Sequence, residues 1–368
     1  MKTKMLGTLA AVTALVAALA LWLTAGREAA PERSPGEMLA PGLLDAVNEV
    51  NSIRITDAES GAVTTLELVE DRWTIAERGG YPAEVTDLRR GVLAFAEARL
   101  VEAKTANPDF YGRLGVEDPA TAGASSRRIE VELPAASFDV IVGALASRGQ
   151  TSTFVRRAGE AQSWAASGNL RLDADPKDWL ERAILDLPTQ TVRSVVITHP
   201  DGGTVAITKA EPGLPNFAVA DVPEGRELLS PSAGNSIAGA LASLRLEDVV
   251  ARSDFDPGEA EPVRATFAGF DGRRATVSAW RVDDVRYVTV ALDFDPALVA
   301  VAPDETGTDG ADAESTIEVA DAAAVADLAS RLDGWVFAIP SYKHSNLTKR
   351  LDDLLKPAES PGTDAEGP

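Results

Sequence analysis

The sequence predicts an α+β fold: two tandem repeats of a β-β-α-β-β-β module, each an antiparallel sheet with a helix on one face, after an N-terminal transmembrane helix. Three observations lead to this prediction. The phrase VNSIRITDAESG at 50–61 returns as VRSVVITHPDGG at 192–203. Each phrase is followed by a helical period and then by the period-two alternation of strands. Residues 5–25 carry no charge.

The uncharged N-terminal run is long enough to cross a membrane, since about 20 apolar residues span a hydrocarbon core of about 30 Å. Lys2 and Lys4 precede the run and Trp22 lies near its far end, so these three residues are predicted at the membrane interface. The positive-inside rule then predicts a single-pass membrane protein with a cytoplasmic N-terminus and with the rest of the chain outside the cytoplasm. A cleaved signal peptide is the alternative, although its apolar region is normally shorter.

The composition is that of a folded, acidic protein. The chain has 368 residues, of which 45% are hydrophobic and 25% are charged, and its formal net charge is −22. The length suggests about two domains, and the negative field argues against nucleic acid as a partner. Because there is no cysteine, disulfides, thiolate metal sites and a cysteine nucleophile are excluded.

The repeat begins with a predicted hairpin in each copy. The two phrases share identities at Val50 and Val192, Ser52 and Ser194, Ile55 and Ile197, Thr56 and Thr198, and Gly61 and Gly203. After each turn a second apolar strand is predicted, at 73–75 in the first copy and 217–219 in the second. The recurrence is interpreted as the duplication of one module.

A helix and three strands complete each predicted copy. The first helix begins near Pro82, and its apolar face consists of Val85, Leu88, Val92, Phe95 and Ala96. The second helix has the same face in Ile237, Leu241 and Leu244, with Asn235 or Ser236 as its cap. The strands are predicted at 129–133, 138–142 and 153–156 in the first copy, and at 263–267, 275–280 and 287–292 in the second.

Further helices are predicted between and after the copies. Asp175 is a predicted N-cap and Pro176 a first helical residue, so a connecting helix is expected over 175–187. A short helix at 321–332, a strand at 334–340 and an amphipathic helix at 347–355 follow the second copy. The predicted organisation is therefore a cytoplasmic tip (1–4), a transmembrane anchor (5–25), a flexible spacer (26–44), the first repeat (45–174), the connecting helix (175–187), the second repeat (188–338), a C-terminal helix region (339–355) and a disordered tail (356–368).

Several phrases in this order resemble a known bacterial family. They are DRWTI (71–75), YPAEVTDL (81–88), FYGRLGVEDP (110–119), the 143–157 hairpin ending in TFVRR, DPKDWL (175–180) and GWVFAIPSYK (334–343). This pattern is similar to the family called domain of unknown function 4340. The resemblance implies an anchored extracytoplasmic protein, often encoded beside ABC-type export systems like those named for gliding motility, and it implies no catalytic residue. The FYGRLG phrase has no counterpart in the second copy, so any site built there exists once.

The sequence offers no strong catalytic, cofactor or metal motif. His199 and His344 are isolated, and no GxSxG, phosphate-binding loop or HExxH is present. Two Asp-x-Asp-Pro stretches, with Asp254 and Asp256 and with Asp293 and Asp295, are typical of solvated turns. The acidic loop at 304–314 lacks the spacing of a known calcium loop. No catalytic, cofactor-binding or metal-binding residue is therefore predicted, and no cofactor.

One group of residues suggests partner docking. Trp335, Tyr342, Lys343 and His344 combine aromatic and basic side chains near the C-terminal helix. With the anchor and the repeat, they favour a non-enzymatic, membrane-anchored accessory or scaffold protein. The resemblance implies that it is a single-pass protein of the bacterial inner membrane, with a cytoplasmic N-terminus and a periplasmic bulk, that works with the components of an ABC-type export complex. The alternatives are an extracytoplasmic hydrolase of envelope glycans that uses paired carboxylates, and a module that binds a small ligand or Ca²⁺.

Overall fold

The computed structural model of the chain describes residues 33–146, 151–299 and 317–357. Its contacts divide the chain into two compact units. The first unit consists of Met1–Thr74 and Val85–Asp178, and the second of Ile75–Glu84 and Trp179–Pro368. The short segment Ile75–Glu84 therefore comes from the first half of the sequence but packs as a part of the second unit.

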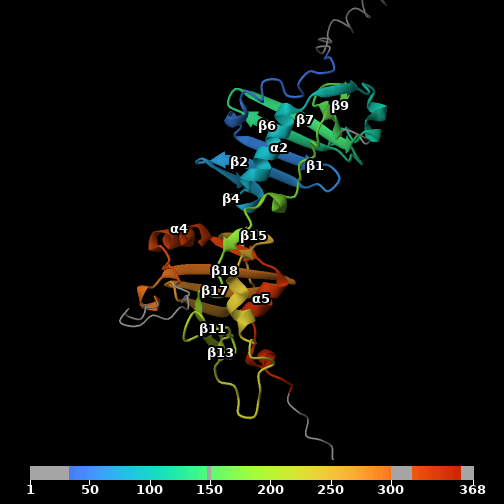
Figure 1. Cartoon of the computed structure of the whole chain (residues 1–368). Helices are drawn as coiled ribbons and strands as arrows, with labels where there is room; N and C mark the ends of the chain where they lie inside the picture. The colour runs from blue at the N-terminus through green and yellow to red at the C-terminus, as the bar shows by residue number, and fades with distance from the viewer. Residues whose placement is uncertain (1–32, 147–150, 300–316, 358–368) are drawn as a thin grey trace, which may run out of the picture. The chain divides into compact units, whose positions relative to one another are not determined.

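The sheet of the first unit has the strand order β4-β3-β2-β1-β6-β7-β8-β9-β5, and its end strand β4 is contributed by the segment Ile75–Glu84 (Figure 1). From β2 to β5 every neighbouring pair is antiparallel. The strands are β1 (Ser52–Asp57), β2 (Val63–Val69), β3 (Arg72–Ile75), β4 (Tyr81–Pro82), β5 (Leu100–Ala103), β6 (Arg127–Leu133), β7 (Ala136–Leu145), β8 (Ser152–Arg157) and β9 (Ser163–Ser167).

Helix α2 (Val85–Glu97) lies across one face of this sheet (Figure 1). Its buried face contains Leu88, Val92 and Phe95, which recur at the spacing of a helical turn, as the sequence predicts. Gly91 is buried on the same face. A Cβ there would lie only 2.8 Å from a methyl group of Leu172, so the position has little room for a larger residue. Helical periodicity thus correctly identifies both the helix and its inward side.

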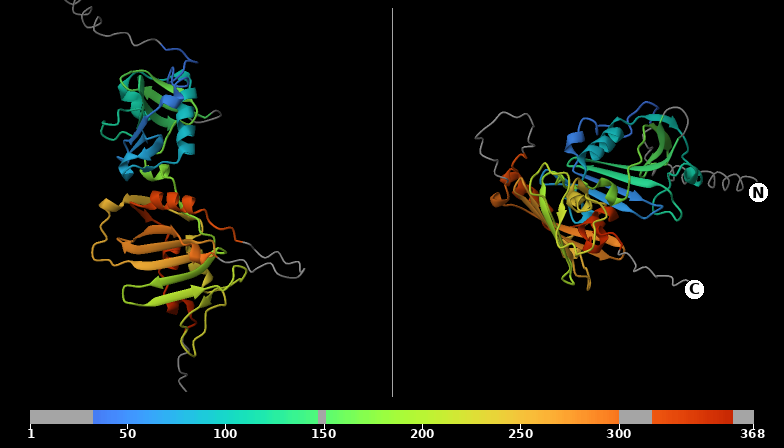
Figure 2. Two further views of the ribbon diagram at one scale, coloured as in Figure 1. Left: turned by 90° about the vertical axis from the view of Figure 1, so that its left-hand side faces the viewer. Right: turned by 60° about the horizontal axis from the view of Figure 1, so that its bottom comes forward.

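The second unit has an eight-stranded sheet with the order β13-β12-β11-β16-β17-β18-β19-β15, and a two-stranded pair, β10 with β14. Helix α5 packs against β16 and β18, and helix α4 packs against β18 (Figure 2). The strands are β10 (Ala183–Leu185), β11 (Val192–Thr198), β12 (Thr204–Thr208), β13 (Ala218–Val219), β14 (Leu244–Arg245), β15 (Asp248–Ala251), β16 (Val263–Gly269), β17 (Arg273–Val282), β18 (Val285–Phe294) and β19 (Trp335–Ala338). The helices are α3 (Asn235–Ala238), α4 (Ala322–Leu332) and α5 (Ser341–Leu347).

The two sheets place their strands in the same spatial order. The run β2-β1-β6-β7-β8-β9-β5 in the first has its counterpart in β12-β11-β16-β17-β18-β19-β15 in the second. The pairing at the edge also corresponds, since Ala103 lies opposite Trp164 and Ala251 lies opposite Trp335. The edge strand β5 directly follows helix α2, whereas β15 follows α3, η5 and the short strand β14.

The predicted class is confirmed at the level of a mixed α and β protein with mostly antiparallel sheets and few helices. The position predicted for the second strand of each hairpin is wrong. The second strand is β2 in the first unit and β12 in the second, whereas the segments expected there form the third strands, β3 and β13. Both missed strands are rich in threonine, and their alternate residues are exposed, so their apolar signal is weak.

Three predicted helices are corrected by the structure. Residues 175–187 form a 3-10 turn, η4 (Pro176–Trp179), and then β10, although Asp175 does accept the expected capping bond from the Lys177 amide. Pairing of β10 with β14 outweighs the local helical signal. The second-copy helix is only α3 followed by the 3-10 turn η5 (Gly239–Leu241), because Gly234 and Gly239 flank it.

The C-terminal helix predicted at 347–355 is also corrected. Helix α5 ends at Leu347, and a separate 3-10 turn, η8, spans Leu351–Leu354. The backbone of Arg350 is extended, and its amide is bonded by the Asp353 carboxylate, so a new turn starts there. The predicted helix at 321–332 and the strand at 334–340 are confirmed as α4, capped by Asp321, and β19.

Several predictions lie outside the described residues: the anchor at 5–25 with Lys2, Lys4 and Trp22, residues 26–32 of the spacer, the acidic loop at 304–314 and most of the C-terminal tail. The rest of the predicted flexible spacer, 33–44, packs on the first unit instead: Leu39, Ala40 and Leu43 are buried, and the Leu39 amide donates to the Ala98 carbonyl at 2.8 Å. Among the residues that the structure does describe, none of the helices combines the length and the apolar character needed to span a bilayer.

Helix α5 buries two basic side chains in the second unit. The Lys343 ammonium donates to the carbonyl of Gly239 at 3.0 Å and to that of Ala242. His344 donates its Nε2 proton to the carbonyl of Trp280 at 3.0 Å. Burial lowers the pKa of His344 below its ordinary 6.5, and Arg286 and Arg281 lower it further, against a rise from the Trp280 bond.

We expect the protein to lose stability as the pH falls below about 6.5, because the unfolded chain accepts a proton on His344 that the folded chain resists. The variant His344→Gln, whose amide can still donate to Trp280, should therefore lose less stability between pH 7.5 and 5.5. Thermal unfolding of both proteins at the two pH values measures this difference. If both proteins lost the same stability between pH 7.5 and 5.5, the loss could not be attributed to His344.

Candidate functional site

The two units differ most in the segment that connects the edge strand to the next strand. In the first unit this connection is residues 104–126, whereas in the second it is residues 252–262. The longer connection contains the FYGRLG phrase, which forms the 3-10 helix η3 (Pro108–Arg113) and the turn after it. Asn107 caps this helix by accepting the Asp109 amide at 3.1 Å, and Pro108 follows at the first helical position.

Tyr111 fixes η3 to the unit. Its ring is buried with Val116 and Ile141, and its hydroxyl donates to the Ala161 carbonyl at 2.5 Å. The Arg156 guanidinium lies 4.6 Å from the ring centroid and donates to the Val116 carbonyl at 2.9 Å. These contacts join η3 to strand β8 and to the loop after it, so η3 is held from several sides.

A backbone contact with β7 holds the turn that follows η3. The pairing of β7 with β8 shifts register between Val142 and Leu145, and the Ala144 amide donates to the Leu114 carbonyl at 2.9 Å. A Cβ at Gly143 would collide with that carbonyl oxygen and would lie 2.8 Å from the Gly115 oxygen. Only glycine at 143 allows this approach.

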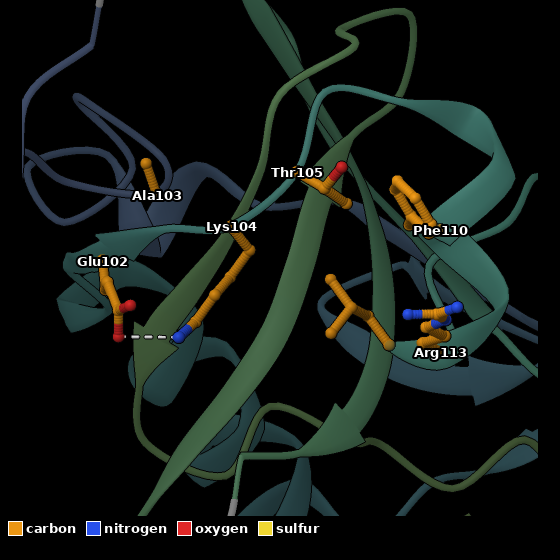
Figure 3. Close-up of a pocket in the computed structure, with 7 residues that line it drawn as sticks. Glu102, Ala103, Lys104, Thr105, Phe110 and Arg113 are labelled. Carbon is orange, nitrogen blue, oxygen red and sulfur yellow. Dashed lines mark ion pairs between the residues drawn. The ribbon is translucent and has the colours of Figure 1, made fainter.

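The fixed turn forms one wall of an open hollow of about 330 Å³. The lining residues are Glu102, Ala103, Lys104, Thr105, Phe110, Arg113 and Leu114. Figure 3 shows the Lys104 side chain turned toward Glu102, while Phe110 and Arg113 lie together on the opposite side. The Lys104 ammonium is 2.6 Å from a Glu102 carboxylate oxygen, so this cation is neutralised locally.

Arg113 is the free cation of the hollow. Its guanidinium lies 4.8 Å from the centroid of the Phe110 ring, which is 42% exposed. Within the described ranges Arg113 has no carboxylate partner. A cation–π contact at an exposed site is worth about 0.5–1 kcal/mol, which favours this orientation of the guanidinium, and the planar guanidinium can offer two parallel donors to a carboxylate. The arrangement can bind an acidic group, whereas proton transfer would need a group that titrates nearer to neutral pH.

Strand β5 beside the hollow has an open outer edge. The segment at 36–39 covers only its beginning, since Gly36 donates to the Leu100 carbonyl at 2.7 Å and Leu100 donates to Glu37 at 2.8 Å. Val101, the next residue, is 51% exposed. Among the described residues no strand pairs with β5 on the side away from β9. An unpaired edge of this kind can accept a further strand.

The equivalent edge in the second unit is covered. The segment Ile75–Glu84 lies there, and Arg78 donates to the Asp248 carboxylate of β15 at 2.7 Å. A Cβ at Gly79 would be in ordinary contact with Ala251, at 3.4 Å. The Tyr81 ring meets Trp335 edge-on, with 5.0 Å between centroids. The same edge of the sheet is thus covered in the second unit, whereas among the described residues most of it is uncovered in the first.

The residues predicted as a docking patch are only partly exposed. Lys343 and His344 are buried and bonded to backbone carbonyls of the second unit, as described above. Trp335 is half-buried on β19, and Tyr342 is 63% exposed. The structure therefore offers Tyr342 to a partner but uses Lys343 and His344 inside the unit.

The other sequence candidates have local roles. Asp254 accepts from the Ser253 hydroxyl, Asp256 accepts from the Gly258 amide, and Asp295 accepts from the Ala297 amide and pairs with Arg274. Asp293 is exposed on β18. His199 is buried and donates to the Lys349 carbonyl at 3.2 Å. Three or more metal-ligating side chains do not gather anywhere in the described ranges.

Comparison with known proteins supports the sequence resemblance. The family described as Domain of unknown function (DUF4340) matches residues 73–265, which is just over half of the chain. The chain belongs to the DUF4340 family. No curated protein and no solved structure matches this DUF4340 chain.

The hollow lies entirely inside the stretch that matches the DUF4340 family, whereas the residues from Trp335 to His344 lie beyond it. Sequence pattern alone does not single out Phe110 and Arg113 as site residues. The available signal is the FYGRLG phrase itself, which the DUF4340 chain carries only in its first half.

We expect Gly143→Ala to destabilise the protein by about 1–3 kcal/mol, because the new methyl group forces β7 and the Leu114 carbonyl apart. Gly213→Ala is the matched control, since no atom lies within 4 Å of a Cβ there. Denaturant unfolding of the two variants and the parent chain checks the expectation. A Gly143→Ala protein as stable as the Gly213→Ala protein would show that the contact is not tight.

Proposed function

We propose that this DUF4340 chain is a non-enzymatic, membrane-anchored accessory or scaffold protein in the periplasm, which docks on a component of an ABC-type export complex. The observation that carries the proposal is the docking edge, defined as the open edge of β5 together with the Phe110–Arg113 pair beside it. A rigid edge with an unpaired guanidinium suits recognition of another chain, because its groups are ordered before binding.

The sequence supports the membrane part of the proposal. Residues 5–25 are long enough to span a bilayer, and Lys2, Lys4 and Trp22 suit its two interfaces. The resemblance to a family often encoded beside ABC-type exporters supports the choice of partner. In this proposal the anchor keeps the docking edge close to the membrane, which raises its effective concentration near a membrane partner.

We also infer that the two units arose by duplication of one module. The matching strand order, the Ala103–Trp164 and Ala251–Trp335 pairs and the shared hairpin phrase support this inference. After such a duplication one edge could be covered within the chain, while the other stayed free for a partner. The FYGRLG connection would then be the specialised feature of the first copy.

The hydrolase alternative receives less support. It needs two carboxylates that face each other across a cleft, at about 5 to 9 Å. The four candidate aspartates instead lie on turns or on an exposed strand, and three of them are occupied by neighbouring amides, a hydroxyl or an arginine.

Site-specific crosslinking in intact cells tests the proposal. A photoreactive benzoylphenylalanine in place of Val101 should crosslink to an integral membrane protein of an ABC-type export system, whereas the same residue in place of Val250, on the covered β15 edge, should not. Arg113→Glu should reduce the Val101 crosslink several-fold, because it repels an acidic partner group. Arg72→Glu, at an exposed arginine of the same unit, serves as the charge-matched control.

Equal crosslinking at the two edges, or a chain found in the soluble fraction, would contradict the proposal. A crosslink that persists unchanged in Arg113→Glu would remove the role of the guanidinium.

A further inference from the structure

A second hollow, of about 320 Å³, lies on the other side of the first unit, against helix α2. We call it the α2 groove. It is lined by Val47, Asn48, Val50, Leu68, Trp73, Leu88, Arg89, Val92 and Leu93. These residues come from α2, from β2 and β3, and from the 3-10 turn η1 (Val47–Glu49) with the residue after it. The groove shares no residue with the docking edge.

The α2 groove is mostly apolar. Val50, Leu88 and Val92 are buried and form its inner part, while Leu68 and Leu93 are 37% and 43% exposed. The exposed parts of Leu68 and Leu93 leave apolar surface in water, which an apolar ligand would cover at a gain of about 25 cal/mol for each Å².

Two polar side chains complete the lining of the groove. Asn48 and Arg89 are exposed, and neither has a partner within the described part of the chain. The next arginine on α2 differs, since Arg90 is paired with Asp87. A few polar groups at the end of an apolar pocket usually fix the orientation of a ligand. The free guanidinium of Arg89 selects a negative charge.

The size of the groove limits the kind of ligand. Small-molecule pockets measure about 300–1,000 Å³, and the groove lies at the lower end of this range. A stable protein interface needs about 800 Å² from each partner, which a hollow of this kind does not supply. The groove therefore suits one apolar chain better than a docked protein.

We propose that the α2 groove binds a single-chain anionic amphiphile, with its apolar chain along Leu88, Val92 and Trp73 and its anionic end at Arg89. A free fatty acid and a lipid with a phosphate head both have this chemistry. The inference goes beyond the proposed function and does not depend on it, because the docking edge and the groove are separate sites.

Photolabelling of the full chain in nanodiscs of zwitterionic lipid tests this site. The probe is a dodecanoic acid that carries a diazirine, and mass spectrometry locates the label. We expect labelling in peptides that cover 63–74 and 85–97, and protection by unlabelled dodecanoate at about tenfold lower concentration than dodecyltrimethylammonium or dodecanol, as one charge-assisted hydrogen bond allows. Protection by dodecyl phosphate as well would indicate lipid phosphates as a source, and protection by dodecanoate alone would indicate free fatty acids.

Variants separate charge from fold. Arg89→Gln should abolish the preference for dodecanoate, whereas the matched control Arg90→Gln should retain it. Leu93→Asp should reduce labelling several-fold, since it places a second negative charge at the groove. Labelling spread over other peptides, or equal protection by the acid, the alcohol and the ammonium compound, would overturn the proposal. If the crosslink at Val101 is absent while photolabelling of the α2 groove is intact, the proposed function is contradicted and the proposal for the α2 groove stands.

Discussion

The docking edge depends on one backbone contact, between the Ala144 amide of β7 and the carbonyl of Leu114. The contact is possible because Gly143 has no Cβ that would meet the same oxygen. The rest of the FYGRLG turn is held through Tyr111, whose hydroxyl donates to the Ala161 carbonyl and whose ring packs against the Arg156 guanidinium. Because the turn is ordered by folding, the proposed docking would not have to order its backbone again.

The two sheets share one strand order but differ in how their edge strands, β5 and β15, are covered. Unpaired sheet edges tend to bind other strands, so proteins usually cover them. In the second unit the segment Ile75–Glu84 covers β15, and the Arg78–Asp248 pair fixes it. In the first unit, residues 36–39 cover only the start of β5. Beside the open remainder lies Arg113, which has no carboxylate partner among the described residues although the net charge of the chain is −22.

The sequence predicts what local periodicity determines. Helix α2 follows from the spacing of Leu88, Val92 and Phe95, and the long strands of both units follow from alternation. Prediction from the sequence fails where contacts with residues distant in the sequence determine the local structure. Pairing with β14 turns a predicted helix into β10, and burial against Gly239 and Ala242 draws Lys343 inward from a polar-looking stretch.

The candidate site shows the same limit. Sequence pattern indicates that the FYGRLG phrase occurs once, which is the right place to look. It does not show that Gly143, about thirty residues later, lies against Leu114, because that contact exists only in the folded sheet. The free state of Arg113 likewise depends on which carboxylates the fold brings near. Chemistry set by residues distant in sequence is therefore visible only in the structure.

The central claim is that the FYGRLG turn is rigid before any partner binds. Amide hydrogen exchange of the free full-length chain, followed by mass spectrometry, measures this most directly. The amides of Leu114, Val116 and Ala144, which are bonded to Tyr111 and Leu114 carbonyls, should exchange as slowly as those of β6 and much more slowly than the loop at 210–216. Exchange of these three amides at the rate of that loop would contradict the account.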